Sequence, residues 1–301
     1  MAVTPPRILS APRVLGDTRA TLGEGLCWSP SEQAVWWVDI LEHRLYRDDA
    51  KAGTHDAWSF DETISAVAER AGQPGLAVTL RRGLALFDPA TRALTRLDEP
   101  EREREGNRFN DGKCDSRGRF WGGTMDFAVR APTGALYRFD AEGRAQRAID
   151  LGWIVTNGPA WTRDGRTMFV NDTVHRRVVA YAFDPETGAV GASREWLVLS
   201  EADGHPDGMT TDADGRLWIA HWGGSCVTCH DPVTGAELAR IALPTAHITN
   251  VAFGGPDMTT LFVSSAKFEL SEAQLAAQPL AGALFAVETD ARGQAAHLYA
   301  G

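Results

Sequence analysis

Residues 212–220 read DADGRLWIA, a tight turn that leads directly into a short apolar strand. Asp and Gly suit the turn because they adopt backbone conformations that most residues avoid. The apolar residues that follow include a tryptophan, a composition that is typical of a buried strand. Stretches of this design recur along the whole chain, and their recurrence indicates the fold.

Five further copies of the turn-and-strand pattern occur, and a second strand that often ends in Asp follows each of the six. The first strands begin at Ala34, Leu76, Phe120, Thr167, Leu217 and Leu261, and the second ones cover 44–48, 83–88, 135–140, 179–184, 226–231 and 283–287. The spacing of about 40–50 residues matches one four-stranded propeller blade. We therefore expect an all-β, six-bladed β-propeller with four-stranded blades. A β-sandwich with regularly spaced strands is the alternative, which the paired repeat disfavours.

The six copies use up the chain, so residues 1–301 are expected to form a single propeller domain. A strand near Ile8 to Leu15 should pair with the last blade and close the ring, because closure hides sheet edges. One helix is expected over Ser271 to Gln278, where a capping-box pattern opens it and Pro279 ends it.

Composition excludes several function classes. The formal net charge of −10 argues against a binder of nucleic-acid backbone, which needs a basic face. Residues 1–16 lack the apolar core of a signal peptide, and no apolar run approaches a membrane span. We expect a cytoplasmic monomer. Cys226 and Cys229 form a CxxC, which could be a redox pair or half a zinc site, but a strand with buried cysteines is favoured.

The stretch from Asn107 to Lys113 (NRFNDGK) concentrates two cations, two amides and a carboxylate, and we expect it to form a binding loop. The charged run Leu97–Glu105 precedes it. That run is interpreted most simply as a solvated loop, with a lid over the site as the alternative.

One polar residue stands about 12 positions before the strand centre of every repeat. These six residues are Glu24, Ser65, Asn110, Asn157, Asp207 and Asn250. Equivalent positions of a propeller converge on its axis, so a ring of carboxylate and amide oxygens is predicted around one channel. Each residue taken alone could be an ordinary turn residue.

Two carboxylates that face one partly buried channel would repel each other without compensation. A divalent cation resolves this repulsion, and these oxygens suit Ca²⁺, Mg²⁺, Mn²⁺ or Zn²⁺. About three strong protein ligands are evident, which leaves coordination positions open for water or substrate, as in a catalytic metal site.

Five segments together closely resemble the gluconolactonase/regucalcin (SMP-30-like) family over nearly the whole chain, and later stretches look most like its bacterial aldonolactonases. These segments are residues 21–25, 107–113, 123–125, 156–159 and 206–209. The resemblance implies a six-bladed propeller that hydrolyses sugar-acid lactones with one divalent metal ion, whether Ca, Zn, Mn, Mg or Fe.

By the same resemblance, Glu24, Asn157 and Asp207 would be the metal ligands, while Arg108 and Asn110 would hold sugar hydroxyls with Asp111 beside them. This sequence departs from the family at one point. Some relatives carry a substrate-contacting glutamate shortly after Gly-Thr-Met, where strict register places Ala128 here. Asp126 is the candidate substitute.

The expected activity is hydrolysis of aldonolactones, such as xylono-, arabinono-, galactono- or gluconolactone, to the aldonic acid in oxidative sugar catabolism. Asp207 would accept a proton from the attacking water. Two alternatives stay open: a metal-dependent propeller esterase or phosphotriesterase, and a non-catalytic calcium-binding propeller. A serine hydrolase is disfavoured because the sequence has no GxSxG elbow.

Overall fold

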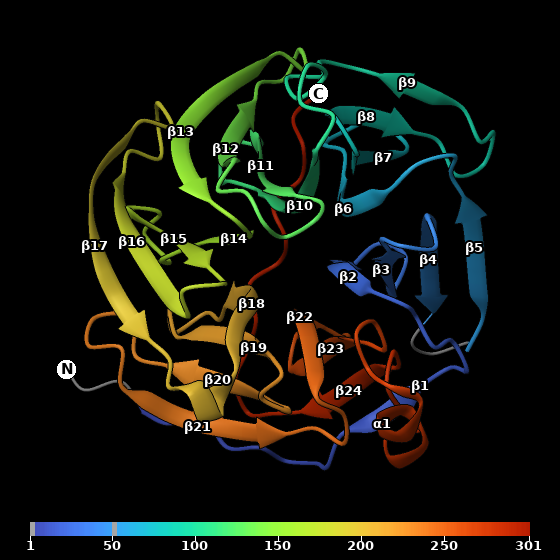
Figure 1. Ribbon diagram of the computed structural model, residues 1–301, viewed down its shortest axis with the longest axis vertical. Coiled ribbons are helices and arrows are strands. Elements are labelled where there is room, and N and C mark those ends of the chain that lie inside the picture. The colour runs from blue at the N-terminus through green and yellow to red at the C-terminus, as the bar shows by residue number, and fades with distance from the viewer. Residues whose placement is uncertain (1–3, 50–52) are drawn as a thin grey trace.

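The computed structural model describes residues 4–49 and 53–301. It is an all-β, propeller-like fold in which sheets are arranged around a common axis (Figure 1). Four sheets have four strands each, and within each sheet the strands follow chain order from the axis outward. Their bounds are β2 Gly23–Ser29, β3 Ala34–Asp39, β4 Arg44–Asp49 and β5 His55–Ser59; β6 Ile64–Glu69, β7 Leu76–Leu80, β8 Leu84–Phe87 and β9 Leu94–Arg96; β10 Asn107–Cys114, β11 Phe120–Asp126, β12 Gly134–Phe139 and β13 Ala145–Trp153; β14 Thr156–Trp161, β15 Thr167–Asp172, β16 Arg177–Phe183 and β17 Val190–Val198.

The remaining eight strands form one sheet. They are β18 His205–Thr211, β19 Leu217–Trp222, β20 Cys226–His230 and β21 Glu237–Ala242, then β22 His247–Gly254, β23 Thr260–Ala266, β24 Leu284–Glu288 and β1 Arg13–Leu15. A single residue pair, Trp222 with His247, joins the two groups of four. The rings of these two residues stack with their centroids 4.0 Å apart. The prediction of four-stranded blades is thus confirmed for four sheets, whereas the last eight strands are one continuous sheet.

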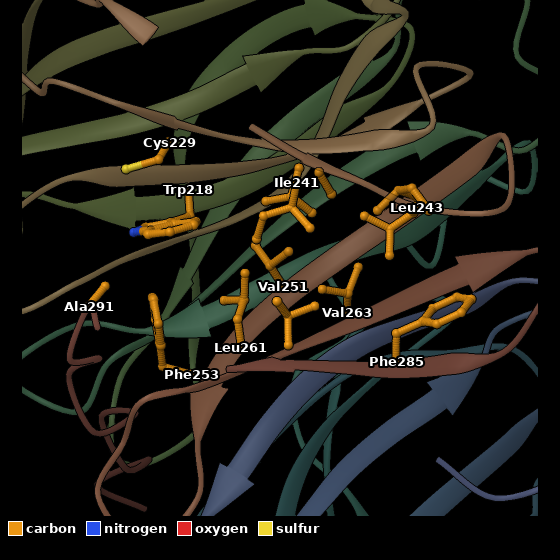
Figure 2. Close-up of a cluster of buried hydrophobic side chains, with 14 of the residues drawn as sticks. Trp218, Cys229, Ile241, Leu243, Val251, Phe253, Leu261, Val263, Phe285 and Ala291 are labelled. Atoms are coloured by element: carbon orange, nitrogen blue, oxygen red, sulfur yellow. The ribbon is translucent and has the colours of Figure 1, made fainter. Parts of the chain in front are cut away.

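Apolar side chains fill the space between the two halves of this eight-stranded sheet (Figure 2). Trp218 of β19 packs with Phe253 of β22 at a ring distance of 5.4 Å, nearly edge to face. Ile241, Val251 and Phe285 belong to the same cluster and are almost completely buried. The two halves therefore pack face to face in the manner expected of neighbouring blades.

Strand β1 closes the last group, as predicted. It pairs antiparallel with β24 from Arg13 to Leu15, and an isolated bridge joins Ile8 to Thr289. The predicted helix is also confirmed. Helix α1 covers Glu272–Ala277, and Ser271 forms the capping box with Gln274. A short 3-10 helix, η1, covers Glu201–Asp203 just before β18.

The six innermost strands touch one another in a closed order: β2, β6, β10, β14, β18, β22 and back to β2. The predicted binding loop from Asn107 to Lys113 is itself one of them, β10, and not a loop. Its polar side chains tolerate a strand because an innermost propeller strand faces the axis, where other polar groups meet it. This correction places the motif on a rigid element.

A buried aspartate fixes the turn in two of the repeats. The Asp212 carboxylate accepts hydrogen bonds from Arg216 Nε at 2.6 Å and Trp218 Nε1 at 2.8 Å, and from the main-chain N–H of Asp214 and Arg216. Asp115 makes the equivalent bonds in the third sheet. The spacing Asp-x-x-Gly-Arg-x-Trp therefore records one structural unit that ties the turn to the strand after it.

Replacing Asp212 by alanine should lower the free energy of unfolding by about 3 kcal/mol, because it leaves the Nε–H of the buried Arg216 and the indole N–H of the buried Trp218 without their acceptor. Asp184→Ala is the matched control, since Asp184 accepts turn amides but is exposed and pairs with neither Arg nor Trp. Urea unfolding measures both. An equal loss in the two variants would mean that the buried pairings contribute nothing beyond the turn.

Cys226 and Cys229 lie in β20 as free, buried residues, which confirms the strand interpretation of the CxxC. Burial raises the pKa of the Cys226 thiol to about 11, so the reactive thiolate is scarce at neutral pH. Among the described residues, no helix combines the length and apolarity needed to cross a bilayer.

Candidate metal centre

A backbone irregularity turns the polar residue of each innermost strand toward the axis. In all six strands the pairing register with the second strand shifts at or beside the predicted residue: Glu24, Ser65, Asn110, Asn157, Asp207 and Asn250. Such bulges redirect side chains and occur often next to active sites. The predicted ring thus has a shared backbone cause, which the sequence pattern alone does not reveal.

All six ring residues are buried, with at most 7% of each exposed. Two hydrogen bonds join them across blade boundaries: Asn110 Nδ2 donates to Asn157 Oδ1 at 2.7 Å, and Asn250 Nδ2 donates to Glu24 Oε2 at 2.9 Å. Arg108 Nη1 donates to Asn110 Oδ1 at 2.6 Å. Ser65 is different, because its hydroxyl pairs with Thr79 Oγ1 of its own sheet at 2.9 Å.

Burial and mutual repulsion disfavour the ionised forms of the carboxylates in this centre. Burial, and next the Asp111 charge, raises the pKa of Glu24 to about 8. Burial, then the Glu24 and Asp111 charges, raises the pKa of Asp207 well above its usual range. Burial lowers the pKa of Arg108 to about 10. Glu24 and Asp207 therefore lie close enough for their charges to repel each other.

This donor set fits a divalent cation. Two buried carboxylates and the Asn157 amide oxygen supply hard ligands, and a cation would remove the repulsion that raises both acid pKa values. No three His, Cys, Asp or Glu side chains gather as a metal cluster within residues 4–49 and 53–301. The fit therefore depends on the amide as the third ligand.

A chain of hydrogen bonds holds Asn157 and Asp207 relative to each other. Asn157 Nδ2 donates to Thr173 Oγ1 at 2.9 Å, and this hydroxyl donates to the main-chain oxygen of Pro206 at 2.8 Å. Asn171 Nδ2 donates to the main-chain oxygen of Asp207, while the buried Asn171 Oδ1 has no partner among the described residues. Thr173 and Asn171 could not be predicted from the sequence, because nothing in or beside β15 marks them as different from strand and turn residues.

Gly208 follows Asp207 because the next blade comes very close. A Cβ at this position would lie 2.5 Å from Asn250 Cγ, so any other residue would push β22 away. Gly25, after Glu24, has a φ of 61° and similar crowding, since a Cβ there would lie 2.9 Å from the main-chain oxygen of Ser65. Both Glu-Gly and Asp-Gly pairs therefore reflect close packing around the axis.

Two further polar residues of β10, Asn107 and Asp111, bond to neighbouring segments of the chain. Asn107 Nδ2 donates to Glu101 Oε2 at 2.8 Å, and the Asp111 carboxylate accepts from the main-chain N–H of Gly112 and Gly158. Glu101 is completely buried and also accepts from Tyr137 Oη at 2.6 Å. The interpretation of residues 97–105 as a merely solvated loop is therefore wrong at Glu101, which anchors the loop to β10 and β12.

The loop after β11 lies beside the candidate substrate arginine. The Asp126 carboxylate accepts hydrogen bonds from the main-chain N–H of Arg130 and Ala131, so its visible role is to shape this loop. Phe127, 44% exposed, has its ring centroid 5.8 Å from the Arg108 guanidinium carbon. Phe127 therefore lies beside the candidate substrate arginine, although no sequence pattern predicted it there.

The family model described as SMP-30/Gluconolactonase/LRE-like region matches residues 22–267. The chain belongs to this family. The family resemblance expected from the five segments is thus confirmed, and the match includes Glu24, Arg108, Asn110, Asn157 and Asp207.

Individual relatives agree with this assignment over almost their full length. The chain is 36% identical to the L-arabinolactonase of Azospirillum brasilense, with 96% of this chain and 95% of the relative covered. It is 37% identical to the pentonolactonase of Haloferax volcanii, with 92% and 94% covered. The solved structure titled as a calcium-binding protein, regucalcin, from Agrobacterium tumefaciens superposes with a TM-score of 0.91 at 31% identity, covering 96% and 97%.

Proposed function

We propose that this protein is a metal-dependent hydrolase that opens sugar-acid lactones to the aldonic acid in oxidative sugar catabolism. The observation that carries the proposal is the buried pair of carboxylates, Glu24 and Asp207, beside the bonded pair Arg108 and Asn110. Two relatives named as lactonases of pentose-derived sugars support this substrate class.

Glu24, Asn157 and Asp207 would hold one divalent ion. When bound, such an ion polarises a lactone carbonyl and stabilises the negative charge that develops on its oxygen. The calcium-binding description of the Agrobacterium relative makes Ca²⁺ one of the first ions to test, with Zn²⁺, Mn²⁺, Mg²⁺ and Fe²⁺.

Arg108 and Asn110 orient the ring hydroxyls, so that the carbonyl carbon meets the attacking water in a reactive geometry. Asp207 accepts one proton from this water while the water oxygen adds to the carbonyl carbon. The ring C–O bond then breaks, and the leaving oxygen takes the proton that Asp207 accepted and becomes a hydroxyl group. The acid that forms ionises, so each turnover releases one proton. Asp111, beside these groups, is proposed as a further substrate contact.

Arg108→Ala should raise KM about 10- to 100-fold and change kcat much less, because the guanidinium binds ground state and transition state alike. Steady-state kinetics on the preferred lactone measure this split. Arg102→Ala is the control, because Arg102 is an exposed arginine that pairs only locally with Glu99. An unchanged KM in Arg108→Ala would remove Arg108 from the substrate site.

Proton release on addition of D-xylono-, L-arabinono-, D-galactono- and D-gluconolactone tests the function, with the spontaneous rate subtracted. Acceleration on one lactone supports the proposal and names the substrate. Acceleration only on an aryl ester or phosphotriester would favour an esterase, and ion binding without any hydrolysis would favour a non-catalytic propeller.

We also infer that the eight-stranded sheet comprises two blades, which makes six in a single domain. The closed order of the six innermost strands and the single residue pair between the two halves support this count. A cytoplasmic location and a monomeric state stay predictions.

A further inference from the structure

Lys113 of β10 lies near the acid cluster, by which we mean the carboxylates of Glu24, Asp111 and Asp207. Its Nζ donates a hydrogen bond to the main-chain oxygen of Met209, two residues after Asp207 and on a different blade. Burial lowers the pKa of Lys113, and the nearby Asp111 and Glu24 carboxylates act in the opposite direction and favour its charged form. The side chain thus connects β10 to β18 next to carboxylates of the proposed metal centre.

Lys113 sets the sign of the net charge around the axis once an ion is bound, because without Lys113 the three carboxylates and Arg108 sum to −2, which one divalent ion only neutralises. Glu24, Asp111 and Asp207 supply three carboxylates, and Arg108 interacts with Glu24 and Asp207. With Lys113 included, the fully ionised residues sum to a net charge of −1. One divalent ion brings the sum to +1, which is the sign that attracts an oxyanion or a carboxylate product.

The chain uses lysine very sparingly, which makes the choice at this position informative. Only three of its 30 basic residues are lysines, and the other 27 are arginines. The ammonium group is compact and accepts any donor direction, whereas a guanidinium is a broad planar fork. Lysine therefore supplies a compact positive charge that bonds the Met209 carbonyl.

A cavity on the far side of Lys113 can keep the ammonium hydrated. The cavity has a volume of about 200 Å³, and Lys113 lines it together with the outgoing ends of the innermost strands and the C-terminal segment from Gln294 to His297. Waters in a cavity of this size can accept the ammonium N–H groups that Met209 does not use. Burial lowers the pKa of Lys113, whereas the neighbouring carboxylates, and waters in this cavity, oppose that shift and favour the charged form.

We infer that Lys113 is a built-in counter-charge of the metal centre. Its ammonium stabilises the empty acid cluster, competes electrostatically with the bound ion, and keeps the loaded centre net cationic toward the anion that forms during lactone opening. Lys113 is a positioning residue, because it acts through the neighbouring carboxylates and not by touching the substrate. This inference rests on the proposed function.

The affinity of the metal-free protein for a divalent ion tests the inference, because removal of the lysine charge should increase this affinity. Lys113→Gln removes the charge and keeps a donor for the Met209 carbonyl, and Lys113→Met, as a second variant, removes both. Isothermal titration with Mn²⁺ and Ca²⁺ should show about tenfold tighter binding in both variants, because a unit cation within several ångströms no longer repels the ion. Lactone turnover should fall in the same variants despite the tighter binding.

Lys267→Gln is the matched control, because it removes one positive charge of the same kind at the start of the segment between β23 and α1. Its ion affinity should stay unchanged. Equal or weaker binding in both Lys113 variants, while the wild type binds the ion, would overturn the counter-charge role alone. Failure of the wild type to bind any ion would instead overturn the proposed metal centre, and this inference with it.

Discussion

Replacing Asp207 by alanine should lower kcat/KM for lactone opening about 1,000-fold or more, because the residue combines two roles in the proposed mechanism. It supplies one of only two carboxylates to the metal centre, and it accepts the proton of the attacking water. Its main chain is fixed on both sides, by Asn171 at its own carbonyl and by Thr173 at Pro206. The truncation therefore removes the carboxylate and leaves the strand in place.

The measurement is initial-rate proton release on the preferred lactone at saturating metal. Asp203→Ala is the matched control: it removes a carboxylate four residues earlier, in η1, where Asp203 pairs with Arg240 at 2.8 Å away from the axis. The control should keep nearly full activity. If Asp207→Ala kept activity comparable to the control, both the ligand and the base assignment would be wrong.

Glu24→Gln should have opposite effects on the empty and the loaded protein. Burial raises the pKa of Glu24 to about 8, so at pH 7 the metal-free fold holds a proton on this carboxyl that the unfolded chain does not, and this proton uptake destabilises the fold. Glutamine keeps the shape and cannot ionise in the unfolded chain, so the metal-free variant should gain stability on the order of 2 kcal/mol. Ion affinity should fall at least about 100-fold, since one of two anionic ligands is lost.

Thermal unfolding without and with Mn²⁺ measures both effects in one experiment. The wild type should be stabilised by the ion, whereas Glu24→Gln should start higher and respond little. The sign of the effect on the metal-free protein distinguishes the two interpretations of Glu24. If the metal-free variant is less stable than the metal-free wild type, Glu24 is a structural hydrogen-bond acceptor for Asn250 and not a metal ligand.

Much of the architecture was predictable because it follows from local patterns. Turn residues before apolar strands recur at blade spacing, and each of these strands is present. The closing strand and the capping box of α1 are equally local signals. Residues at equivalent repeat positions must converge in a propeller, so the ring from Glu24 to Asn250 could be predicted before any side chain was placed.

What could not be predicted depends on contacts between distant segments. The bulges that turn the ring residues inward arise from pairing register, which a single strand does not encode. Glu101 looks like one acid in a charged run, and only its contacts with Asn107 and Tyr137 show that it is buried. Ser65 matches the ring pattern but pairs within its own sheet. Lys113 is part of the predicted motif, but only the hydrogen bond from its Nζ to the main-chain oxygen of Met209 shows where its side chain lies.

The central claim is that Glu24, Asn157 and Asp207 hold a divalent ion that lactone opening requires. The direct test is the rate of proton release on the preferred lactone before chelation, after removal of the metal with a chelator, and after each divalent ion is restored. Chelation should reduce the rate to the spontaneous level, and one or more ions should restore it. Full activity in the chelated protein, with metal content verified as negligible, would contradict it.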